Sequence, residues 1–380
     1  MKKVFIIQNI IPNYREPVFR KIAKNLDLTV FYSKLSREAK SKSFVQKNKF
    51  NGFKTILLPS LSFRNGVYQF SFIKHVFLKR PDAVIAQNFG HLDMLLALIL
   101  CKILVIDFYW WNGGVPYLNK DEPLKGSISK LFGDKDPRIL LSKCATGIFV
   151  YSDHAKMYFE KKGYKNKIIV APNSPDTNNF FKIKEMFQNS QNLLQDFKLK
   201  FSPNGEHVIL LVGRLDKTRR TSDLIQAYNQ IIQHYPNVSL VIVGDGSERT
   251  KNEQEIQKLG LKNVYFEGAI YDDELLAKYY MVSDFFVTPG VASMAIKIAM
   301  LFGIPVITAD YGLEVHVIKD GINGYVYPIG EFKQISNLIK HLINDQLSYS
   351  KISNNALETI KKDVNINKMT EAFVKEINQL

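Results

Sequence analysis

The stretch from Ser283 to Asp310 constrains the fold of this chain more than any other. Its two apolar runs, DFFV and PVIT, are short and rich in β-branched and aromatic residues, which is typical of parallel strands buried on both faces. Between them apolar residues recur at helical spacing, and Gly303 followed by Pro305 ends the helix. The helical stripe consists of Met294, Ile298, Met300 and Leu301. The stretch therefore predicts a strand–helix–strand unit of a parallel sheet.

The glycine turn of this unit places a helix N-terminus, near residues 290–294, at the carboxyl edge of the sheet. Backbone N–H groups and the positive end of the helix dipole can hold a phosphate there. A unit of this kind can equally serve only to pack a sheet, because a fold does not dictate a function. Both interpretations stay open at this point.

Strands and helices alternate along most of the chain, which predicts parallel, doubly wound sheets. The alternation lapses between Phe180 and Glu206 and starts again at HVILLVGRL. We therefore expect an α/β protein with two Rossmann-like doubly wound parallel-sheet domains that face each other across a cleft. The expected divisions are an N-terminal domain (1–180), a linker (181–205), a C-terminal domain (206–364) and a terminal helix (365–380) that packs back on the N-terminal domain.

The chain of 380 residues carries 51 Lys and Arg against 36 Asp and Glu, a net charge of +15. Such a surface attracts an anionic partner, such as nucleic acid, acidic lipid or a phosphorylated substrate. A Lys- and Asn-rich composition that keeps the protein soluble explains part of the excess. Nucleic acid is not expected as a partner, because the sequence contains no RRM, KH or helix-turn-helix pattern.

The cysteines and the apolar segments indicate the compartment. Cys101 and Cys144 lie in apolar segments without metal or redox spacing, so we expect buried free thiols in a reducing cytoplasm. Met1 leads directly into a strand, and no signal peptide is expected. The longest apolar run, 94–106, is shorter than the roughly 20 residues that span a bilayer. We expect a cytoplasmic protein, either soluble or peripheral on the inner face of the cell membrane.

Several segments resemble those of glycosyltransferases with the GT-B fold, in particular the large retaining family 4. The resemblance covers most of the C-terminal half and rests on the order and spacing of PNSPDTNNF, VGRLDKTRRTSDLIQA, VIVGDGSER, FEGAIYDDELLAKYYMVSDFFVTPG and GIPVITAD…DGINGYVY. Near the N-terminus, YREPVFRKIA resembles the start of the acceptor-binding domain.

The resemblance implies an enzyme that moves a sugar, with retained configuration, from a nucleotide-diphosphate sugar to a glycan or lipid-linked acceptor. The implied donor is a UDP- or GDP-sugar, with no metal and no separate cofactor. The implied setting is the synthesis of cell-surface polysaccharide or lipopolysaccharide.

Such a transfer leaves negative charge on a departing nucleotide diphosphate, and without a metal Arg and Lys must stabilise that charge. Arg214 follows Gly213 at a strand end, and Arg219 stands where family members carry a Lys. We expect these two arginines to form the catalytic clamp, because Arg binds phosphate through two parallel hydrogen bonds. Lys217 competes with Arg219 for that role. The alternative is that KTRR is a solvated cluster beside a helix start.

The donor site that the resemblance implies also uses glycine turns and main-chain amides. Besides Gly213 and Lys217, its expected members are Gly244, Asp245, Gly268, Gly290, Ser293, Met294 and Glu314. Glycines at such turns let the backbone approach a base or ribose closely, although a GDG turn after a strand is at least as common without a ligand. The amides of Ser293 and Met294 are expected to cradle the diphosphate.

The sequence departs from the family at a pair of glutamates, separated by seven residues, that contact the donor sugar and the ribose. Gly290 and Ile298 occupy those positions, and neither side chain can accept a hydrogen bond. The stretch PGVASMAIKIAMLFG instead resembles a branch of bacterial polysaccharide glycosyltransferases. An inactive relative that binds a sugar or nucleotide therefore stays open as an alternative. Lys297, beside the second position, is expected to face solvent.

In the N-terminal half, Asn112 stands nearest to the position where family members carry a His close to the donor sugar. We expect Asn112 to hydrogen-bond a sugar hydroxyl as part of the catalytic set. The residues expected to contact the acceptor are Asn13, Tyr14, Arg15, His91 and Trp111. Trp111 either stacks on a sugar face or serves as a core residue or loop anchor.

A basic aromatic helix, expected over 68–80, and the Lys-rich loop 34–54 would contact an anionic membrane. Ordinary sheet packing with a solvated basic face accounts for the helix equally well. Both interpretations stay open at this stage.

Overall fold

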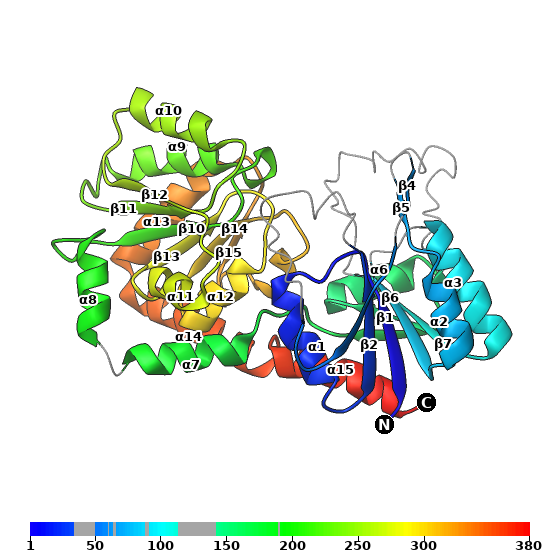
Figure 1. Ribbon diagram of the computed structural model, residues 1–380. Coiled ribbons are helices and arrows are strands. Elements are labelled where there is room, and N and C mark those ends of the chain that lie inside the picture. Colours follow the sequence, from blue (N-terminus) through cyan, green and yellow to red (C-terminus); the bar gives the residue numbers. More distant parts are fainter. Residues whose placement is uncertain (34–49, 60, 64–65, 88–90, 113–141, 189–190) are drawn as a thin grey trace. The chain divides into compact units, whose positions relative to one another are not determined.

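The computed structural model describes residues 1–33, 50–59, 61–63, 66–87, 91–112, 142–188 and 191–380 (Figure 1). The described chain forms two compact units. Unit 1 comprises Met1–Asn173 together with Ile366–Leu380, and unit 2 comprises Ser174–Asn365. Each unit contains a parallel sheet with helices on both faces, which confirms the predicted class of an α/β protein with two doubly wound parallel sheets.

Unit 1 is built on a seven-stranded sheet in which every neighbouring pair is parallel. In spatial order its strands are β3 (Lys54–Leu57), β2 (Asp27–Tyr32), β1 (Lys3–Ile7), β6 (Ala83–Gln87), β7 (Asp107–Trp111), β8 (Gly147–Val150) and β9 (Lys167–Val170). A short antiparallel hairpin, β4 (Leu61–Phe63) and β5 (Gly66–Tyr68), stands apart from this sheet.

Helices cover both faces of the unit 1 sheet. One apolar cluster packs the sheet against α2 (Phe72–Lys79), α3 (His91–Leu104) and α6 (Asp153–Lys161). The other packs it against α1 (Glu16–Ile22), which follows the 3-10 turn η1 (Asn13–Arg15), and against α15 (Ile366–Asn378). Alternate residues of each strand supply the two clusters, as the period of a strand requires.

Helix α15 supplies part of the unit 1 core from the far end of the sequence. The Phe373 ring stacks on Phe149 with centroids 4.2 Å apart, and the Tyr109 hydroxyl donates to the Glu376 carboxylate at 2.7 Å. The apolar residues on its packed face are fully buried: Ile366, Met369, Phe373 and Ile377. Residues 366–380 therefore belong to unit 1.

Unit 2 contains a six-stranded parallel sheet. In spatial order its strands are β12 (Val264–Gly268), β11 (Ser239–Val243), β10 (Val208–Val212), β13 (Phe285–Thr288), β14 (Val306–Ala309) and β15 (Tyr325–Tyr327). Its helical elements are α7 (Thr177–Gln188), α8 (Gln191–Leu199), η2 (Lys217–Arg219), α9 (Thr221–Ile231), α10 (Arg249–Lys258), α11 (Asp273–Met281), α12 (Ala295–Phe302), η3 (Val315–Val317), α13 (Phe332–Asn344) and α14 (Gln346–Lys362).

The residues expected to form a linker, 181–205, lie in α7, α8 and the turn after α8. Ile183 and Phe187 are buried in the unit 2 core because one face of α7 packs on α11 and α12, and Phe201, in the turn after α8, is buried in the same core. The chain thus passes from unit 1 to unit 2 between Asn173 and Ser174, a few residues before the expected boundary at 180.

Both sheets reverse their winding at an internal strand. In unit 1 the chain adds β2 and β3 on one side of β1 and then β6 on its other side. In unit 2 it adds β11 and β12 beside β10 and then β13 on the other side. Loops that leave the carboxyl ends of such neighbours diverge to opposite faces, and ligands of α/β proteins bind in the space between them. The β1/β6 and β10/β13 edges are therefore where sites are expected.

The structure tests the expectations about cysteines and apolar segments. Cys101 is buried as expected, and burial raises the pKa of its thiol to about 12. Cys144 is exposed, so that expectation was wrong, because the residue lies in the turn before β8 and not in a strand or helix. Among the described residues, no helix is both long and apolar enough to cross a bilayer.

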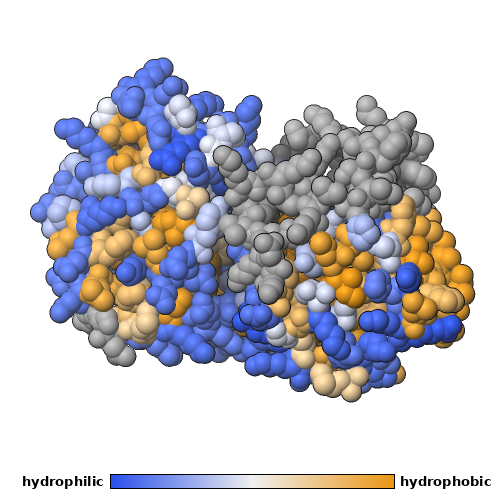
Figure 2. Space-filling view, viewed as in Figure 1, coloured by the Kyte–Doolittle hydropathy of each residue, from blue (hydrophilic) through white to orange (hydrophobic). Residues whose placement is uncertain are grey.

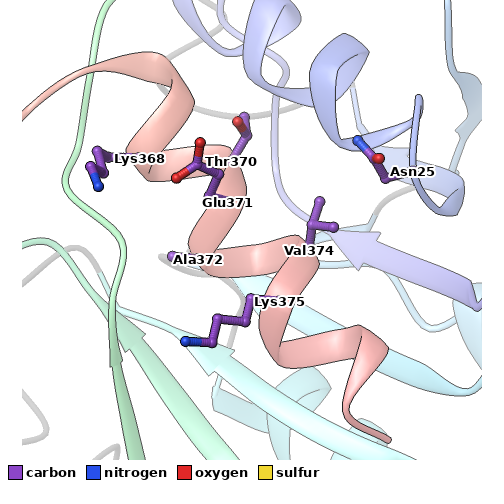
Figure 3. Close-up of a pocket in the computed structure, with 7 residues that line it drawn as sticks. All are labelled: Asn25, Lys368, Thr370, Glu371, Ala372, Val374 and Lys375. Atoms are coloured by element: carbon purple, nitrogen blue, oxygen red, sulfur yellow. The ribbon is translucent and has the colours of Figure 1, made fainter.

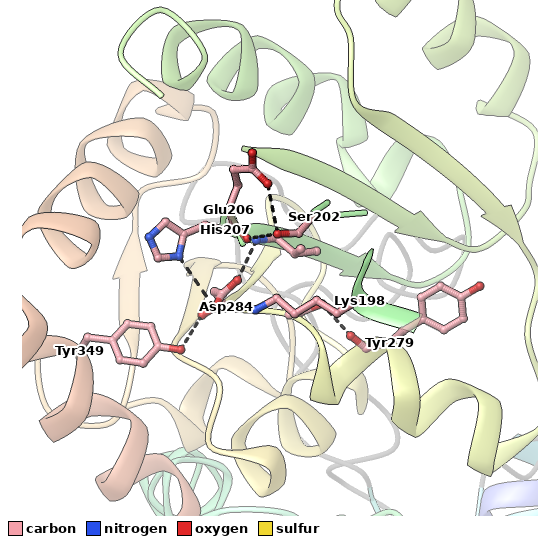
Figure 4. A network of polar contacts seen from close by, with 9 residues as sticks. Lys198, Ser202, Glu206, His207, Tyr279, Asp284 and Tyr349 are labelled. Carbon is pink, nitrogen blue, oxygen red and sulfur yellow. Dashed lines mark hydrogen bonds and ion pairs between the residues drawn. The ribbon is translucent and has the colours of Figure 1, made fainter. Parts of the chain in front are cut away.

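A polar network surrounds Asp284 at the edge of the unit 2 sheet where the strands begin (Figure 4). The Asp284 carboxylate accepts a hydrogen bond from the Val208 N–H at 2.8 Å and lies 3.8 Å from Nδ1 of His207 and 3.9 Å from Nζ of Lys198. Its carbonyl accepts from the Tyr349 hydroxyl at 3.1 Å. The network ties β13 to β10 and α14 at the edge opposite to the glycine turns.

Replacement of Asp284 by Ala should destabilise the protein by about 1–3 kcal/mol, because the Val208 N–H then loses its acceptor. Asp284→Asn keeps a carbonyl oxygen for that N–H and should cost less. Thermal and urea unfolding of both variants measures the difference. Equal stability of Asp284→Ala and the parent protein would contradict the role assigned to this side chain.

Candidate functional site

Arg214 and Arg219 lie in the loop that follows β10, at the β10/β13 edge of unit 2. Gly213 turns the chain there, and the Arg214 side chain is exposed. Arg219 ends η2, whose first residue, Lys217, is exposed. The half-buried Arg219 guanidinium donates to the carbonyl of Val291, in the loop after β13. The structure thus brings both expected arginines to one edge and ties one of them to the neighbouring loop.

Two glycines expected near the donor are required for packing of loop against loop. A Cβ on Gly244 would lie 1.8 Å from the carbonyl oxygen of Gly213, and one on Gly290 would lie 2.1 Å from that of Thr218. The same Thr218 carbonyl accepts from the Val291 N–H at 3.0 Å. Gly290 stands at the position of the first family glutamate, and the backbone of residues 218–219 fills the space that any side chain would need.

Ser293 and Met294 lie at the N-terminal end of α12, directly after the β13 turn, and both are half-buried. Their carbonyls accept the first hydrogen bonds of the helix, from the N–H groups of Ile296 at 3.1 Å and Lys297 at 3.0 Å. The helix dipole places partial positive charge at this end. A helix N-terminus beside guanidinium groups has the chemistry that binds a diphosphate.

Lys297 does not face solvent, so that expectation was wrong. Its side chain is 4% exposed, and its ammonium group forms an ion pair with the carboxylate of Glu314, which follows β14. The expectation failed because α12 is enclosed on nearly every side: residues 295–301 are all buried. Glu314, expected to contact the donor, therefore holds a lysine adjacent to Ile298, the position of the second family glutamate.

Lys297→Met should destabilise the protein by about 3–5 kcal/mol, because it removes one partner of an enclosed ion pair. The double variant Lys297→Met/Glu314→Leu removes both charges and should recover most of that loss. Urea unfolding of the parent and the two variants measures these differences. A double variant no more stable than the single one would contradict this account of the pair.

The remaining residues expected at the donor site lie at the ends of β11 and β12, beside Arg249, which the sequence did not single out. Asp245 is exposed and accepts from the Gly246 N–H at 2.7 Å, and Gly268 ends β12. Arg249 lies with its guanidinium 4.0 Å from the Asp245 carboxylate and 3.8 Å from where a Cβ on Gly268 would stand. A hydrogen bond to Glu253 raises the pKa of Arg249. In the sequence, Arg249 is the final residue of VIVGDGSER, the segment that also carries Gly244 and Asp245.

Several of the expected acceptor residues, and Asn112 of the expected catalytic set, lie around the carboxyl edge of the unit 1 sheet. Asn13 and Tyr14 are exposed in η1. Asn112 follows β7, and its N–H donates to the Phe149 carbonyl at 2.9 Å. His91 is the first residue of α3, and its side chain lies outside the described residues, as does the Lys-rich segment 34–49.

Arg15 and Trp111 are buried and not exposed. Trp111 is 1% exposed, with the Arg15 guanidinium 4.7 Å from its ring centroid and the Phe373 ring packed edge-on at 4.7 Å. Stacking of a sugar on the Trp111 ring is therefore excluded in this structure, and the ring has a core role. The strand alternation that places Tyr109 in the core under α15 places Trp111 there as well.

Other candidates for a site in the described chain would be a cavity or a group of metal-binding side chains. A cavity of about 530 Å³ lies along α15 (Figure 3), lined by Asn25, Lys368, Thr370, Glu371, Ala372, Val374 and Lys375. None of the expected donor or acceptor residues lines it. Within the described ranges, no group of three or more His, Cys, Asp or Glu side chains is placed to hold a metal ion.

Comparison with known proteins assigns a family to most of unit 2. Residues 194–359 match the family model described as Glycosyl transferases group 1. Spore coat protein SA of Bacillus subtilis (strain 168) is 28% identical over 175 residues, which are 42% of this chain and 44% of that protein. Capsular polysaccharide biosynthesis glycosyltransferase CapM of Staphylococcus aureus is 27% identical over 226 residues, 57% of each chain. The chain thus spans about half the length of these relatives.

The fold of the whole chain is shared with solved structures. HepE of Anabaena, crystallised in complex with UDP, superposes with a TM-score of 0.73 at 19% identity and covers 100% of both chains. At that identity the likeness establishes the architecture alone, which is the GT-B fold.

Proposed function

We propose, because residues 194–359 belong to the glycosyl transferases group 1 family, that this protein transfers a sugar from a nucleotide-diphosphate sugar. The observation that carries the proposal is the position of Arg214, Arg219 and the N-terminus of α12 at the β10/β13 edge. Two guanidinium groups and main-chain donors at one such edge suit a diphosphate. The UDP in the complex of Anabaena HepE favours a UDP-sugar as the donor.

In the proposed reaction, the bond between the sugar C1 and the diphosphate oxygen breaks while a bond forms between C1 and an acceptor oxygen. The proton of the acceptor hydroxyl passes to the departing phosphate oxygen, so no side chain has to act as the base. Arg214 and Arg219 stabilise the charge that develops on the diphosphate, and the amides of Ser293 and Met294 add main-chain donors. The acceptor attacks on the face that the phosphate leaves, which retains the configuration.

Arg214→Ala should abolish the rise in melting temperature that a UDP-sugar gives the parent protein. Loss of a charge-assisted hydrogen bond weakens binding by about tenfold or more. A ligand that binds only the native state raises the melting temperature by an amount that grows with the logarithm of its affinity, so weaker binding gives a smaller shift. Thermal denaturation with a panel of UDP- and GDP-sugars measures the effect.

The matched control is Lys251→Ala, which removes an exposed cation from α10 and should leave the thermal shift unchanged. A full shift in Arg214→Ala would place the diphosphate elsewhere. A lost shift in both variants would mean that net charge, and not a clamp, drives binding.

A second candidate function is a catalytically inactive subunit that binds a sugar or nucleotide. The replacement of both family glutamates by Gly290 and Ile298 favours it, since the packing around Gly290 leaves no room for a side chain. Release of UDP from the bound donor, measured with extracted glycan acceptors, separates the two functions. Tight binding without turnover would support the inactive subunit.

Retention of configuration and independence from metal ions are parts of the same proposal. The anomeric proton coupling of the product tests the first, and activity in EDTA tests the second. An inverted product, or activity that EDTA removes and Mg²⁺ restores, would contradict them.

We place the protein in the cytoplasm at the inner face of the cell membrane, acting on a glycan or lipid-linked acceptor in polysaccharide or lipopolysaccharide synthesis. The name of the relative CapM favours this setting. Apolar side chains gather over α2 and α3 of unit 1 (Figure 2), where Phe77, Leu78, Ile103 and Val105 are 54%, 65%, 72% and 92% exposed. The cations beside them on the same segments are Lys74, Lys79, Arg80 and Lys102. Exposed apolar residues among cations suit an anionic lipid surface.

The double variant Leu78→Ser/Ile103→Ser should bind vesicles of acidic lipid about tenfold or more weakly than the parent protein, because two apolar side chains no longer insert. The matched control Leu193→Ser/Leu347→Ser changes two exposed leucines of unit 2, which are 58% and 85% exposed. Co-sedimentation at low salt measures binding. Equal binding of the two double variants would contradict the proposed surface.

A further inference from the structure

Three side chains form a row across the carboxyl edge of the unit 1 sheet. The register of β1 with β6 ends with Ile7 opposite Ala86, so Gln8 and Gln87 are the next residues along the two segments, and Gln87 pairs with Trp111 on β7. Side chains alternate between the faces of a strand, and Ile6, Ile85 and Trp111 all pack in the cluster under α1 and α15. Gln8 and Gln87 therefore lie on the same face as Trp111. The row begins at the β1/β6 edge, where the winding of the sheet reverses.

Arg15 lies over this row and is enclosed. It is 2% exposed, and its guanidinium lies 4.7 Å from the Trp111 ring centroid. It donates to the Tyr151 hydroxyl and to the Met369 sulfur at 3.6 Å. Gln87 donates to the same Tyr151 hydroxyl at 3.0 Å. Aromatic rings, a hydroxyl and a thioether thus surround the positive charge.

The charge of Arg15 is not balanced by a neighbouring acid. Among the described residues, Arg15 forms no ion pair with a carboxylate. Glu16 is next in the sequence, but its carboxylate accepts from the Arg20 guanidinium at 2.7 Å. A buried cation without a counter-ion is costly, and such groups usually have a partner.

Three donor atoms of this row and of Arg15 are buried without a hydrogen-bond partner. They are Nε2 of Gln8, Nε of Arg15 and Nε1 of Trp111, and these side chains are 2%, 2% and 1% exposed. Buried donors are almost always satisfied in native proteins. A group that fits here must supply several acceptor lone pairs and a negative charge, which is the description of an oxyanion.

We propose that this cluster of Gln8, Arg15 and Trp111 binds an oxyanion carried by the sugar acceptor, a carboxylate or a phosphate. The proposal rests on the proposed function and specifies its acceptor as an acidic sugar. The guanidinium pairs with the oxyanion through charge-assisted hydrogen bonds, and the amide of Gln8 and the indole N–H of Trp111 complete the donor set. The β1/β6 edge is where a ligand of this sheet is expected.

A purely structural Arg15 accounts for fewer of these observations. It would explain the contacts with Tyr151 and Met369, which join η1 to β8 and α15. It would leave the three donors and the positive charge without partners. The two accounts differ in a measurable way, because a structural arginine changes stability and not the affinity for an anion.

The test is calorimetric titration of the full chain with glucuronic acid, glucose 6-phosphate and, as the neutral reference, glucose. The parent protein should bind one of the acidic sugars about tenfold or more tightly than glucose. Preference for glucuronic acid identifies a carboxylate as the oxyanion, and preference for glucose 6-phosphate identifies a phosphate. No preference over glucose would overturn the proposal.

Arg15→Met fills the same space without charge and should weaken binding of the preferred acidic sugar by about 10- to 100-fold. Trp111→Phe removes one donor and should weaken it severalfold. The matched control is Lys24→Met, which removes an exposed cation from the same unit and should leave the affinity unchanged. Unchanged affinity in Arg15→Met, or an equal loss in Lys24→Met, would overturn the proposal.

Two further measurements keep these results interpretable. The melting temperature of each variant without ligand shows that it is folded, and Trp111→Phe keeps the cluster testable should Arg15→Met fail to fold. The thermal shift with a UDP-sugar should be the same in Arg15→Met and the parent protein. Absence of a UDP-sugar shift in the parent protein would contradict the proposed donor. Whether the cluster binds an oxyanion is decided by the titration with acidic sugars alone.

Discussion

The close contact between the β13 turn and the loop after β10 is the constraint on which the candidate donor site depends. Gly290 approaches the backbone of residues 218–219 so closely that no side chain fits between them. The same approach lets the Arg219 guanidinium reach the Val291 carbonyl and fixes it beside the N-terminus of α12. In the family that the sequence resembles, a glutamate at the position of Gly290 contacts the sugar. A glutamate cannot fit here, because its side chain would clash with the backbone of residues 218–219. The chain instead has Arg219 and the N-terminus of α12 side by side at this edge.

The sheets of both units reverse their winding at one strand, and different polar side chains lie at that edge in each unit. In each sheet the winding reverses at the first strand of the unit, and polar groups gather at the carboxyl ends of the strands on either side. In unit 2 these groups are the arginines after β10 and a helix N-terminus. In unit 1 they are the donors of Gln8 and Trp111 under the guanidinium of Arg15. Both edges are rich in donors and positive charge, which suits partners that carry phosphate or carboxylate groups.

The sequence predicted what depends on periodicity and failed where tertiary packing decides. Alternating apolar runs were enough for two parallel sheets, and glycine turns after strands located the loops around Arg214 and Gly290. The burial of Lys297 was missed, because spacing along α12 does not reveal that every side of the helix is covered. Trp111 was left open between a surface and a core role, since only the packing of α15 on β7 and β8 encloses it. Arg249 was missed because its position beside β12 depends on how α10 starts.

Helix α15 gives the protein an unusual order of assembly. The face of the unit 1 sheet that carries Trp111 and Phe149 is closed by residues 366–378, which leave the ribosome only after all of unit 2 has been made. Unit 2 is continuous in sequence and can therefore complete its core during synthesis, whereas the first-made sheet waits with an apolar surface uncovered. Nascent chains of this protein are thus expected to need chaperone protection of the unit 1 sheet until α15 has been synthesised.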